Sequence, residues 1–398
     1  MRVLFVSDVY FPRVNGVSTS IRTFRNDLAQ AGVETLLVAP EYPGAAADAE
    51  PGIIRIPSGG VPRDPEDRRF LGGPLKRALN AALAAQVDLV HIHTPFIAHY
   101  AAVRFARTHG LPVVATYHTF FEDYLHHYVP ILPRRIGRFI ARHFTLSQCD
   151  DVAALISPSA PMRDALLAYG VHTPIEVLPT GLPAESYQRG DGARFRARFD
   201  LPTDQPLLLY VGRVAYEKNI DFLLRMFVRV LERRPDALFV IAGEGPAREH
   251  LAKLARELGL AAKVRFIGYL NRSTELPDCY AAGDAFVFAS RTETQGLVLL
   301  EAMAQGTPVV STAELGTRSI LTEGCGAFVV PEEQQAFAAA VLDALALGKD
   351  DPRRRQLHAH AESWASQAMA RRLIAFYEKV RAGTVQTLRI PAVSQIVS

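Results

Sequence analysis

Short apolar runs alternate with helical patterns along most of this chain, and this alternation constrains the fold more than any other feature. In the first half the apolar runs lie near residues 2–7, 34–39, 87–92, 112–117 and 152–157, and helical patterns near 17–31, 74–85, 95–109 and 160–169 separate them. Strands that alternate with helices form parallel sheets, because each crossover helix returns the chain to the same end of the sheet. The sequence therefore predicts a doubly wound α/β domain.

A second series of the same kind follows a break at residues 179–183 and a charged segment at 185–200. Its apolar runs lie near 207–212, 237–242, 264–267, 284–289, 308–311 and 327–330, and its helical patterns near 218–233, 246–258, 296–305 and 333–347. Ligands of open parallel sheets bind beyond the carboxyl ends of the strands. We therefore expect two Rossmann-like domains that face each other across a ligand-binding cleft.

The two series set the expected domain boundaries. We assign residues 1–183 to the first domain, 184–204 to a linker and 205–350 to the second domain. We expect helices at 351–385 that pack back toward the first domain, and a frayed tail at 386–398.

Composition narrows the class of protein. Lysine and arginine total 44 against 41 acidic residues, which is too small an excess to predict nucleic-acid binding. The three cysteines are widely spaced, which fits a reducing cytosol. No uncharged apolar stretch approaches the roughly 18–20 residues that cross a bilayer. We therefore expect a cytoplasmic protein, and its oligomeric state stays open.

The most informative local pattern spans residues 285–310. An apolar strand is followed by a polar turn with Glu293, a helix that opens near Gly296 and contains Glu301, and a second strand. Glu301 falls inside an otherwise apolar helix, where burial of an unpaired carboxylate is costly. We therefore expect ligand hydroxyls to be its partners.

Two cations follow the first strand of the second series. Arg213 can chelate phosphate oxygens and Lys218 adds a compact charge, so together they could hold a diphosphate. An equally good interpretation is a surface pair with Glu217. The turn Gly-Glu-Gly-Pro at 243–246 lacks the third glycine of a dinucleotide fingerprint and fits a strand-to-helix turn with Pro246 at the first helical position.

Two residues of the first domain are further candidates. Gly16 could offer an unhindered N–H to a phosphate at a helix start, or it could simply share a helix cap with Asn15. His118 ends a strand, where active-site residues collect. Seven of the twelve histidines lie between His91 and His127, but their spacing and the lack of an accompanying carboxylate cluster do not predict a metal site.

The segment after His118 is basic and apolar. It contains no acidic residue between Asp123 and Asp150, and four arginines fall near one helical face: Arg134, Arg135, Arg138 and Arg142. Such a helix could lie on an anionic membrane, or it could be a core helix with a solvated arginine face.

In combination, these residues resemble glycosyltransferase family 4, which has the two-domain GT-B architecture, over essentially the whole chain. The motif is the Glu293 and Glu301 pair together with Gly212-Arg213 and Glu217-Lys218. The resemblance implies a retaining hexosyltransferase that uses a nucleotide diphosphate sugar and needs neither a metal nor a cofactor. It also implies that the first domain binds the acceptor and the second binds the donor.

The same resemblance implies roles for individual residues. Arg213 and Lys218 would hold the donor diphosphate. Glu293 would contact the transferred sugar, and Glu301 would bind the ribose hydroxyls. His118 would meet the sugar, and the remaining donor contacts are implied at Gly16, Gly268, Tyr269, Leu270, Gln295, Gly296 and Leu297.

Within the family, the segments around Tyr117-His-Thr119 and Glu122-Asp-Tyr124 resemble the bacterial diacylglycerol glucosyltransferases, which act at the cytosolic membrane face. This likeness favours UDP-glucose as the donor, a membrane lipid such as diacylglycerol as the acceptor, and a peripheral position at the inner face of the plasma membrane. It implies acceptor or membrane contacts for Tyr117, Glu122, Asp123 and the four arginines. Phe120-Phe121 departs from the subgroup, and Leu315-Gly316-Thr317 lacks the paired glycines of the wider family.

Other functions stay open. A GDP-mannose-dependent mannosyltransferase or another family 4 enzyme with a glycan or lipid acceptor would share the motif. A nonhydrolytic sugar-nucleotide epimerase would share the architecture and need no acceptor. A catalytically silent nucleotide-sugar-binding protein would also fit, although the full residue set is present. A dehydrogenase is disfavoured, because the loop at 14–18 lacks G-x-G-x-x-G.

Overall fold

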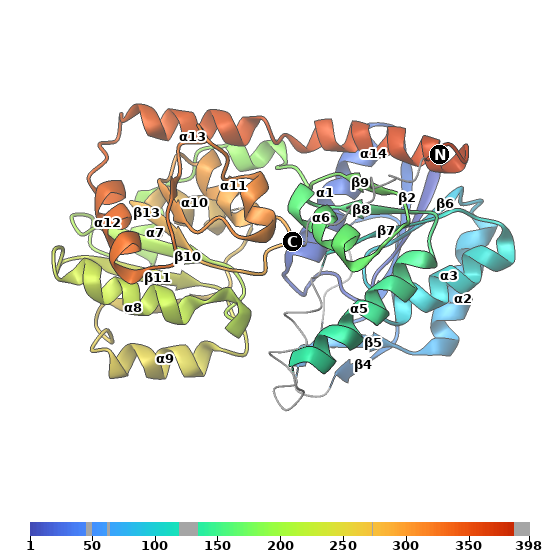
Figure 1. The fold of residues 1–398 in the computed structure, drawn as a ribbon, viewed down its shortest axis with the longest axis horizontal. Coiled ribbons are helices and arrows are strands. Elements are labelled where there is room, and N and C mark those ends of the chain that lie inside the picture. Colours follow the sequence, from blue (N-terminus) through green and yellow to red (C-terminus); the bar gives the residue numbers. More distant parts are fainter. Residues whose placement is uncertain (45–49, 62–63, 119–133, 273, 386–398) are drawn as a thin grey trace, which may run out of the picture. The chain divides into compact units, whose positions relative to one another are not determined.

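The computed structural model describes residues 1–44, 50–61, 64–118, 134–272 and 274–385. These residues form two compact units (Figure 1). The first unit contains the described residues up to 118, residues 134–179 and residues 370–385, and the second contains those of 180–369.

A seven-stranded parallel sheet forms the centre of the first unit, with strand order β3-β2-β1-β6-β7-β8-β9. The strands are β1 (Arg2–Val6), β2 (Glu34–Pro40), β3 (Ile53–Ile56), β6 (Leu89–Ile92), β7 (Val113–Thr116), β8 (Ala154–Ser157) and β9 (Ile175–Val177). The helices are α1 (Gly16–Gln30), α2 (Gly72–Ala84), α3 (Ile97–His109), α5 (Arg134–Asp150) and α6 (Ala160–Tyr169), and β4 (Ser58–Val61) pairs with β5 (Asp64–Phe70) in a separate antiparallel ribbon.

The second unit has a six-stranded parallel sheet with strand order β12-β11-β10-β13-β14-β15. The strands are β10 (Leu207–Val211), β11 (Leu238–Ala242), β12 (Val264–Gly268), β13 (Ala285–Phe288), β14 (Val309–Ser311) and β15 (Phe328–Val329). The helices are α7 (Gly192–Arg198), α8 (Ile220–Leu231), α9 (Arg248–Glu257), α10 (Glu275–Ala282), α11 (Leu297–Ala304), α12 (Gln334–Leu345) and α13 (Pro352–Glu362), with 3-10 turns η1 (Ala184–Tyr187), η2 (Tyr216–Lys218) and η3 (Leu315–Ser319). In Figure 1, α8 and α9 lie on one side of this sheet and α10 and α11 on the other.

The central strands of both sheets are buried on two faces. Every residue of β10, β11 and β13 is buried. Strands covered by helices on both faces need apolar side chains at every position rather than at alternate ones. The predicted fold class, with two Rossmann-like doubly wound domains, is confirmed.

The strand order also marks the positions at which open parallel sheets typically bind ligands. In each sheet the order reverses beside the first strand, between β1 and β6 in the first unit and between β10 and β13 in the second. Connections leave toward opposite faces on either side of such a reversal, so the loops after the two strands part and leave a crevice. The loops after β10 and β13 contain Arg213, Lys218 and Glu293.

The segment at 184–204, which we expected to form a linker, packs within the second unit. It contains η1 and α7, and Arg194 of α7 forms an ion pair with Asp278 of α10, with 2.7 Å between Nε and Oδ2. A Cβ atom on Gly192 would lie 2.6 Å from the carbonyl oxygen of Ala281, so the two helices meet closely.

The C-terminal helices divide between the units. α13 packs in the second unit, where Leu357 is fully buried, whereas α14 (Ser366–Arg381) enters the first unit from residue 370 onward. Tyr377 of α14 is fully buried there, and Arg381 forms an ion pair with Asp88, with 3.0 Å between Nη2 and Oδ1. The expected tail at 386–398 lies outside the described residues.

Candidate active site

The structure brings Lys218 and Glu293 into contact. Lys218 ends η2 after β10, Glu293 lies in the turn after β13, and the Nζ and Oε1 atoms are 2.5 Å apart. Both side chains keep slightly under a fifth of their surface exposed, so the pair is sheltered but reachable. Arg213 lies in the same loop as Lys218, and its Nη1 is 3.5 Å from Glu217 Oε1. The side chains of Arg213 and Glu217 are only 16% and 10% exposed, so this pair does not lie on the open surface as the surface-pair interpretation supposed.

The turn that carries Glu293 is anchored by its own side chains. The amide group of Gln295 accepts the Thr180 N–H at 2.9 Å and donates to the Thr180 carbonyl at 2.6 Å. Gly296 has φ of 98°, a left-handed conformation that glycine adopts without strain, and α11 begins at the next residue. The backbone at 295–297 is therefore held in place at the positive end of the helix dipole.

Glu301 of α11 has partners that the sequence did not predict. Its side chain is 7% exposed, the Tyr280 hydroxyl donates to Oε2 at 2.8 Å, and Arg272 donates to Oε1. The carboxylate therefore has protein partners besides the ligand hydroxyls that we expected, and the expected ligand contact stays a prediction. Arg272 follows β12 and Tyr280 lies on α10, and no sequence pattern indicated that these segments reach α11.

The end of β12 carries three predicted donor residues. Gly268 has φ of 75° and accepts the Gly243 N–H at 2.8 Å, Tyr269 is 42% exposed, and Leu270 is half-buried. The exposed ring of Tyr269 leaves this edge accessible to a base.

The glycine turn at 243–246 packs against the loop that holds Arg213. A Cβ atom on Gly243 would lie 1.9 Å from the Gly212 carbonyl oxygen, and one on Gly245 would lie 2.4 Å from that of Val214. The turn therefore needs glycine for backbone packing. Pro246 is not at the first helical position as expected, because α9 begins at Arg248.

In the first unit, Gly16 is the first residue of α1. The Asn15 side chain caps the helix by accepting the Ser18 N–H at 2.8 Å. A Cβ atom on Gly16 would meet no described atom within 4 Å, and its φ is not in the left-handed region. The helix-cap interpretation thus explains Asn15 but gives no reason for glycine at position 16.

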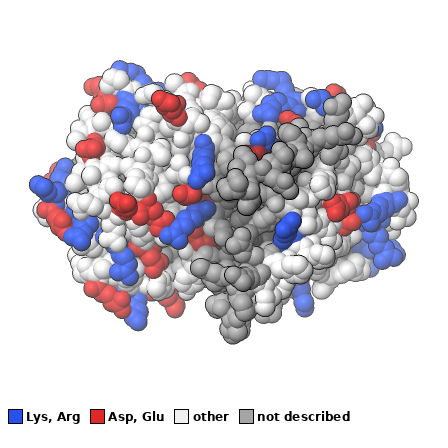
Figure 2. Space-filling view, viewed as in Figure 1, with Lys and Arg blue, Asp and Glu red and all other residues white. Residues whose placement is uncertain are grey.

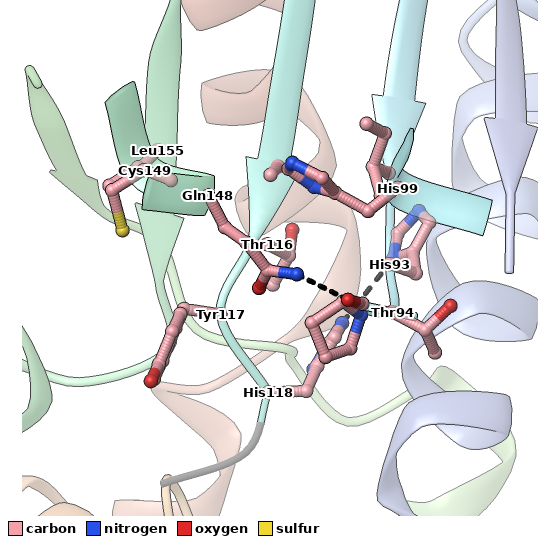
Figure 3. A pocket seen from close by; sticks show the side chains of 12 residues that line it. His93, Thr94, His99, Thr116, Tyr117, His118, Gln148, Cys149 and Leu155 are labelled. Carbon is pink, nitrogen blue, oxygen red and sulfur yellow. Dashed lines mark hydrogen bonds between the residues drawn. The ribbon is translucent and has the colours of Figure 1, made fainter. Parts of the chain in front are cut away.

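His118 is half-buried and forms a cluster with the buried His91 and His93. His118 follows β7 and His93 follows β6, and Figure 3 shows the two rings pointing toward one another, with 3.3 Å between His118 Nε2 and His93 Nδ1. His91 Nδ1 lies 2.6 Å from the Tyr377 hydroxyl and its Nε2 lies 2.6 Å from Thr116 Oγ1. Burial lowers the pKa of His118 to about 4 and that of His93 well below the usual range, so both rings are neutral near pH 7.

A small cavity of about 30 Å³ lies beside this cluster, lined among others by His93, His99, His118 and Gln148 (Figure 3). It is large enough for about one water molecule and too small for a sugar. Within the described part of the chain, no group of three or more histidine, cysteine or acidic side chains is arranged to hold a metal ion.

The residues that we predicted to contact the membrane or the acceptor differ in how exposed they are. Tyr117 is buried, and its hydroxyl lies 2.9 Å from Thr145 Oγ1 of α5. Arg142 of α5 is exposed, and its Nε donates to the Tyr169 carbonyl at 2.8 Å. Glu122 and Asp123 lie outside the described residues. Arg134, Arg135 and Arg138 belong to the helical backbone of α5, but their side chains are outside the description.

Three large apolar side chains on the N-terminal half of α5 face solvent. Ile136, Phe139 and Ile140 are 50%, 71% and 46% exposed. No helix among the residues described combines the length and apolar character that a bilayer span requires. On the face drawn in Figure 2, cationic and acidic side chains are interspersed rather than gathered by sign.

Comparison with known proteins gives matches over both halves of the chain. Residues 14–186 match the model described as "Glycosyltransferase Family 4" and residues 191–364 match "Glycosyl transferases group 1". The chain is 33% identical over 354 residues to the alpha-monoglucosyldiacylglycerol synthase of Streptococcus pneumoniae, covering 87% of this chain and 78% of that protein. It is 27% identical over 318 residues to the enzyme of the same name from Acholeplasma laidlawii, covering 78% and 80%.

Solved structures share the fold. Anabaena HepE in complex with UDP-glucose superposes with a TM-score of 0.73 at 16% identity, covering 95% of this chain and 99% of that one. At this identity the likeness concerns the arrangement of helices and strands.

Proposed function

The chain belongs to glycosyltransferase family 4 and is a glycosyltransferase, and on that premise we propose that it moves glucose from UDP-glucose to a membrane lipid such as diacylglycerol, with retention of the anomeric configuration. The observation that carries the proposal is the contact between Lys218 and Glu293 at the β10–β13 strand reversal. The likeness to two synthases that are named for a glucosyl lipid product supports the choice of acceptor.

The donor diphosphate would bind at the loop after β10. Lys218 and Arg213 offer cations there, and the N-terminus of α11 adds the positive end of a helix dipole. These groups are fixed before the reaction begins, so they can stabilise the charge that develops on the leaving diphosphate without reorganising. Of the two acids in the loops after β10 and β13, Glu293 is paired with Lys218 and Glu217 lies beside Arg213, and we assign neither as a nucleophile.

The proposed reaction therefore occurs on one face of the sugar. The bond from the anomeric carbon to the diphosphate oxygen breaks while the acceptor oxygen bonds to the same carbon. The acceptor proton passes to a diphosphate oxygen, so no protein base is required. Glu293 would contact the sugar, and Glu301 the ribose. Gly16 and His118 remain the candidate ligand contacts of the first unit.

We assign α5 to contact with the membrane. Its exposed Ile136, Phe139 and Ile140 can enter the interfacial region of a bilayer. The arginine-rich sequence of this helix favours anionic headgroups. A peripheral position would place the enzyme at the surface from which a lipid acceptor must be taken.

Mass spectrometry of products from a panel of nucleotide sugars, each with and without diacylglycerol vesicles, tests the proposal. Glucosyl-diacylglycerol formed from UDP-glucose supports it. Mannosyl product from GDP-mannose would instead indicate the alternative mannosyltransferase. An altered nucleotide sugar released without any acceptor would indicate an epimerase.

A further inference from the structure

The two carboxylate oxygens of Glu301 are held in different ways. Oε2 accepts the Tyr280 hydroxyl at 2.8 Å, whereas Oε1 accepts from Arg272. Tyr280 is fully buried, but the Arg272 side chain keeps 25% of its surface exposed. Oε2 is therefore directed into the protein, and Oε1 lies on the side that a ligand can reach.

Tyr280 is well suited to hold a carboxylate still. Its ring packs against Phe286 of β13, with 5.7 Å between the ring centroids, and its carbonyl oxygen accepts the Thr307 hydroxyl at 2.7 Å. Burial, reinforced by the charge of Glu301, keeps the pKa of Tyr280 well above its usual range. The phenol therefore stays protonated near pH 7 and can donate to Glu301 there.

We propose that Tyr280 is a positioning residue for donor binding: it fixes Oε2 of Glu301 so that Oε1 meets a ribose hydroxyl of the nucleotide. This inference rests on the proposed function, in which Glu301 binds the ribose. A glutamate side chain has three rotatable torsions. Because the buried Tyr280 hydroxyl restricts them before the nucleotide binds, binding does not have to bear the entropic cost of ordering this side chain. An ionised carboxylate oxygen has two acceptor sites, so Oε1 can accept a ribose hydroxyl besides the Arg272 donor.

Calorimetric binding of UDP and of 2′,3′-dideoxy-UDP tests this role, because only UDP has the hydroxyls that Glu301 would bind. Tyr280→Phe keeps the ring and removes the donor. We expect wild-type protein to bind UDP at least about tenfold more tightly than the dideoxy compound, which is the scale of a hydrogen bond to a charged group. In Tyr280→Phe this preference should fall by about fivefold or more, with little change in affinity for the dideoxy compound.

Two further variants separate positioning from general damage. Glu301→Gln should lose the preference as well. Tyr187→Phe removes another tyrosine hydroxyl of the same unit, one that donates to the Ala361 carbonyl at 3.0 Å, and it should keep the full preference. Circular dichroism melting of each variant reports whether the fold persists.

The outcomes separate the inference from its premise. The positioning role is refuted if Glu301→Gln loses the preference while Tyr280→Phe keeps it. It is also refuted if Tyr280→Phe weakens the binding of both nucleotides equally. In both cases the proposed function stands. If wild-type protein shows no preference for the ribose hydroxyls, the assignment of Glu301 in the proposed function is itself wrong.

Discussion

Lys218 Nζ lies 2.5 Å from Glu293 Oε1, although 75 residues separate the two in sequence. They meet because β10 and β13 are neighbours in the sheet and both loops leave at the carboxyl end. A cation and an acid held at a strand reversal can each contact a different part of a sugar diphosphate. In the ion pair, each charge compensates the other.

The first prediction concerns this pair. Lys218→Ala and Glu293→Ala should each lower turnover at least about a hundredfold while the fold is kept, since each removes a contact to the transition state. The double variant should lose less than the product of the two single effects, because the residues contact one another. Steady-state kinetics check both statements. Lys253→Ala, at a side chain that is 72% exposed on α9, is the control. Near wild-type rates in either single variant would remove this pair from the mechanism.

Gly16→Ala should separate stability from activity. Because nothing described lies within 4 Å of the added Cβ atom, the variant should melt at the wild-type temperature or slightly above it. If a phosphate approaches the Gly16 N–H, the methyl group should nevertheless lower kcat/KM by about tenfold, the loss of roughly one close contact. Unchanged kinetics would assign Gly16 to the helix start alone.

The histidine cluster predicts acid sensitivity. The folded protein lowers the pKa of His118 from 6.5 to about 4, so the unfolded chain takes up the proton first as pH falls and stability is lost through that window. His91 and His93 act in the same direction. Asp8 has the opposite effect on stability. Burial raises its pKa to about 6, so the folded protein takes up this proton before the unfolded chain does as the pH falls toward 4. The combined effect of three histidines on the free energy of unfolding should exceed that of one aspartate, so acidification should destabilise the protein.

Urea unfolding at pH 7 and pH 5 measures this sensitivity. The wild-type protein should be less stable at pH 5, and His118→Gln should reduce the difference by about 2 kcal/mol. An equal difference in both proteins would mean that His118 is not held neutral by burial.

Membrane contact through α5 predicts a salt-sensitive affinity for vesicles. Reversal of its four arginines to glutamate should abolish binding to anionic vesicles at low salt in a flotation assay. Phe139→Ala should weaken binding by about tenfold, because a ring that is 71% exposed loses apolar transfer energy. The control reverses four cations of α8 and α9: Arg225, Arg229, Lys253 and Arg256. If the α5 variant still binds as the control does, another surface makes the contact.

The sequence predicted most of both sheets because their strands are buried on two faces. The strands β1, β2, β6, β7 and β8 lie within a residue or two of the predicted runs. β3 (Ile53–Ile56) was missed, since it contains Arg55 and lies at the sheet edge, where the apolar run is weaker. α10 was missed because it has only eight residues and contains Pro277, so its period could not be read.

Those omissions explain what the sequence could not predict about the site. Lys218 and Glu293 could be placed from the sequence because each follows the end of a strand, and apolar runs mark the strands. The partners of Glu301 did not, because Tyr280 lies on the unpredicted α10 and Arg272 in the loop before it. A buried carboxylate indicated that partners must exist, but only tertiary packing identifies them.

A crystal structure with bound UDP is the sharpest test of the donor site. The diphosphate should lie within hydrogen-bond reach of Arg213 and Lys218, beside the start of α11, and the ribose hydroxyls should lie at Glu301 Oε1. A nucleotide bound elsewhere in the protein, away from these two cations and from Glu301, would contradict it.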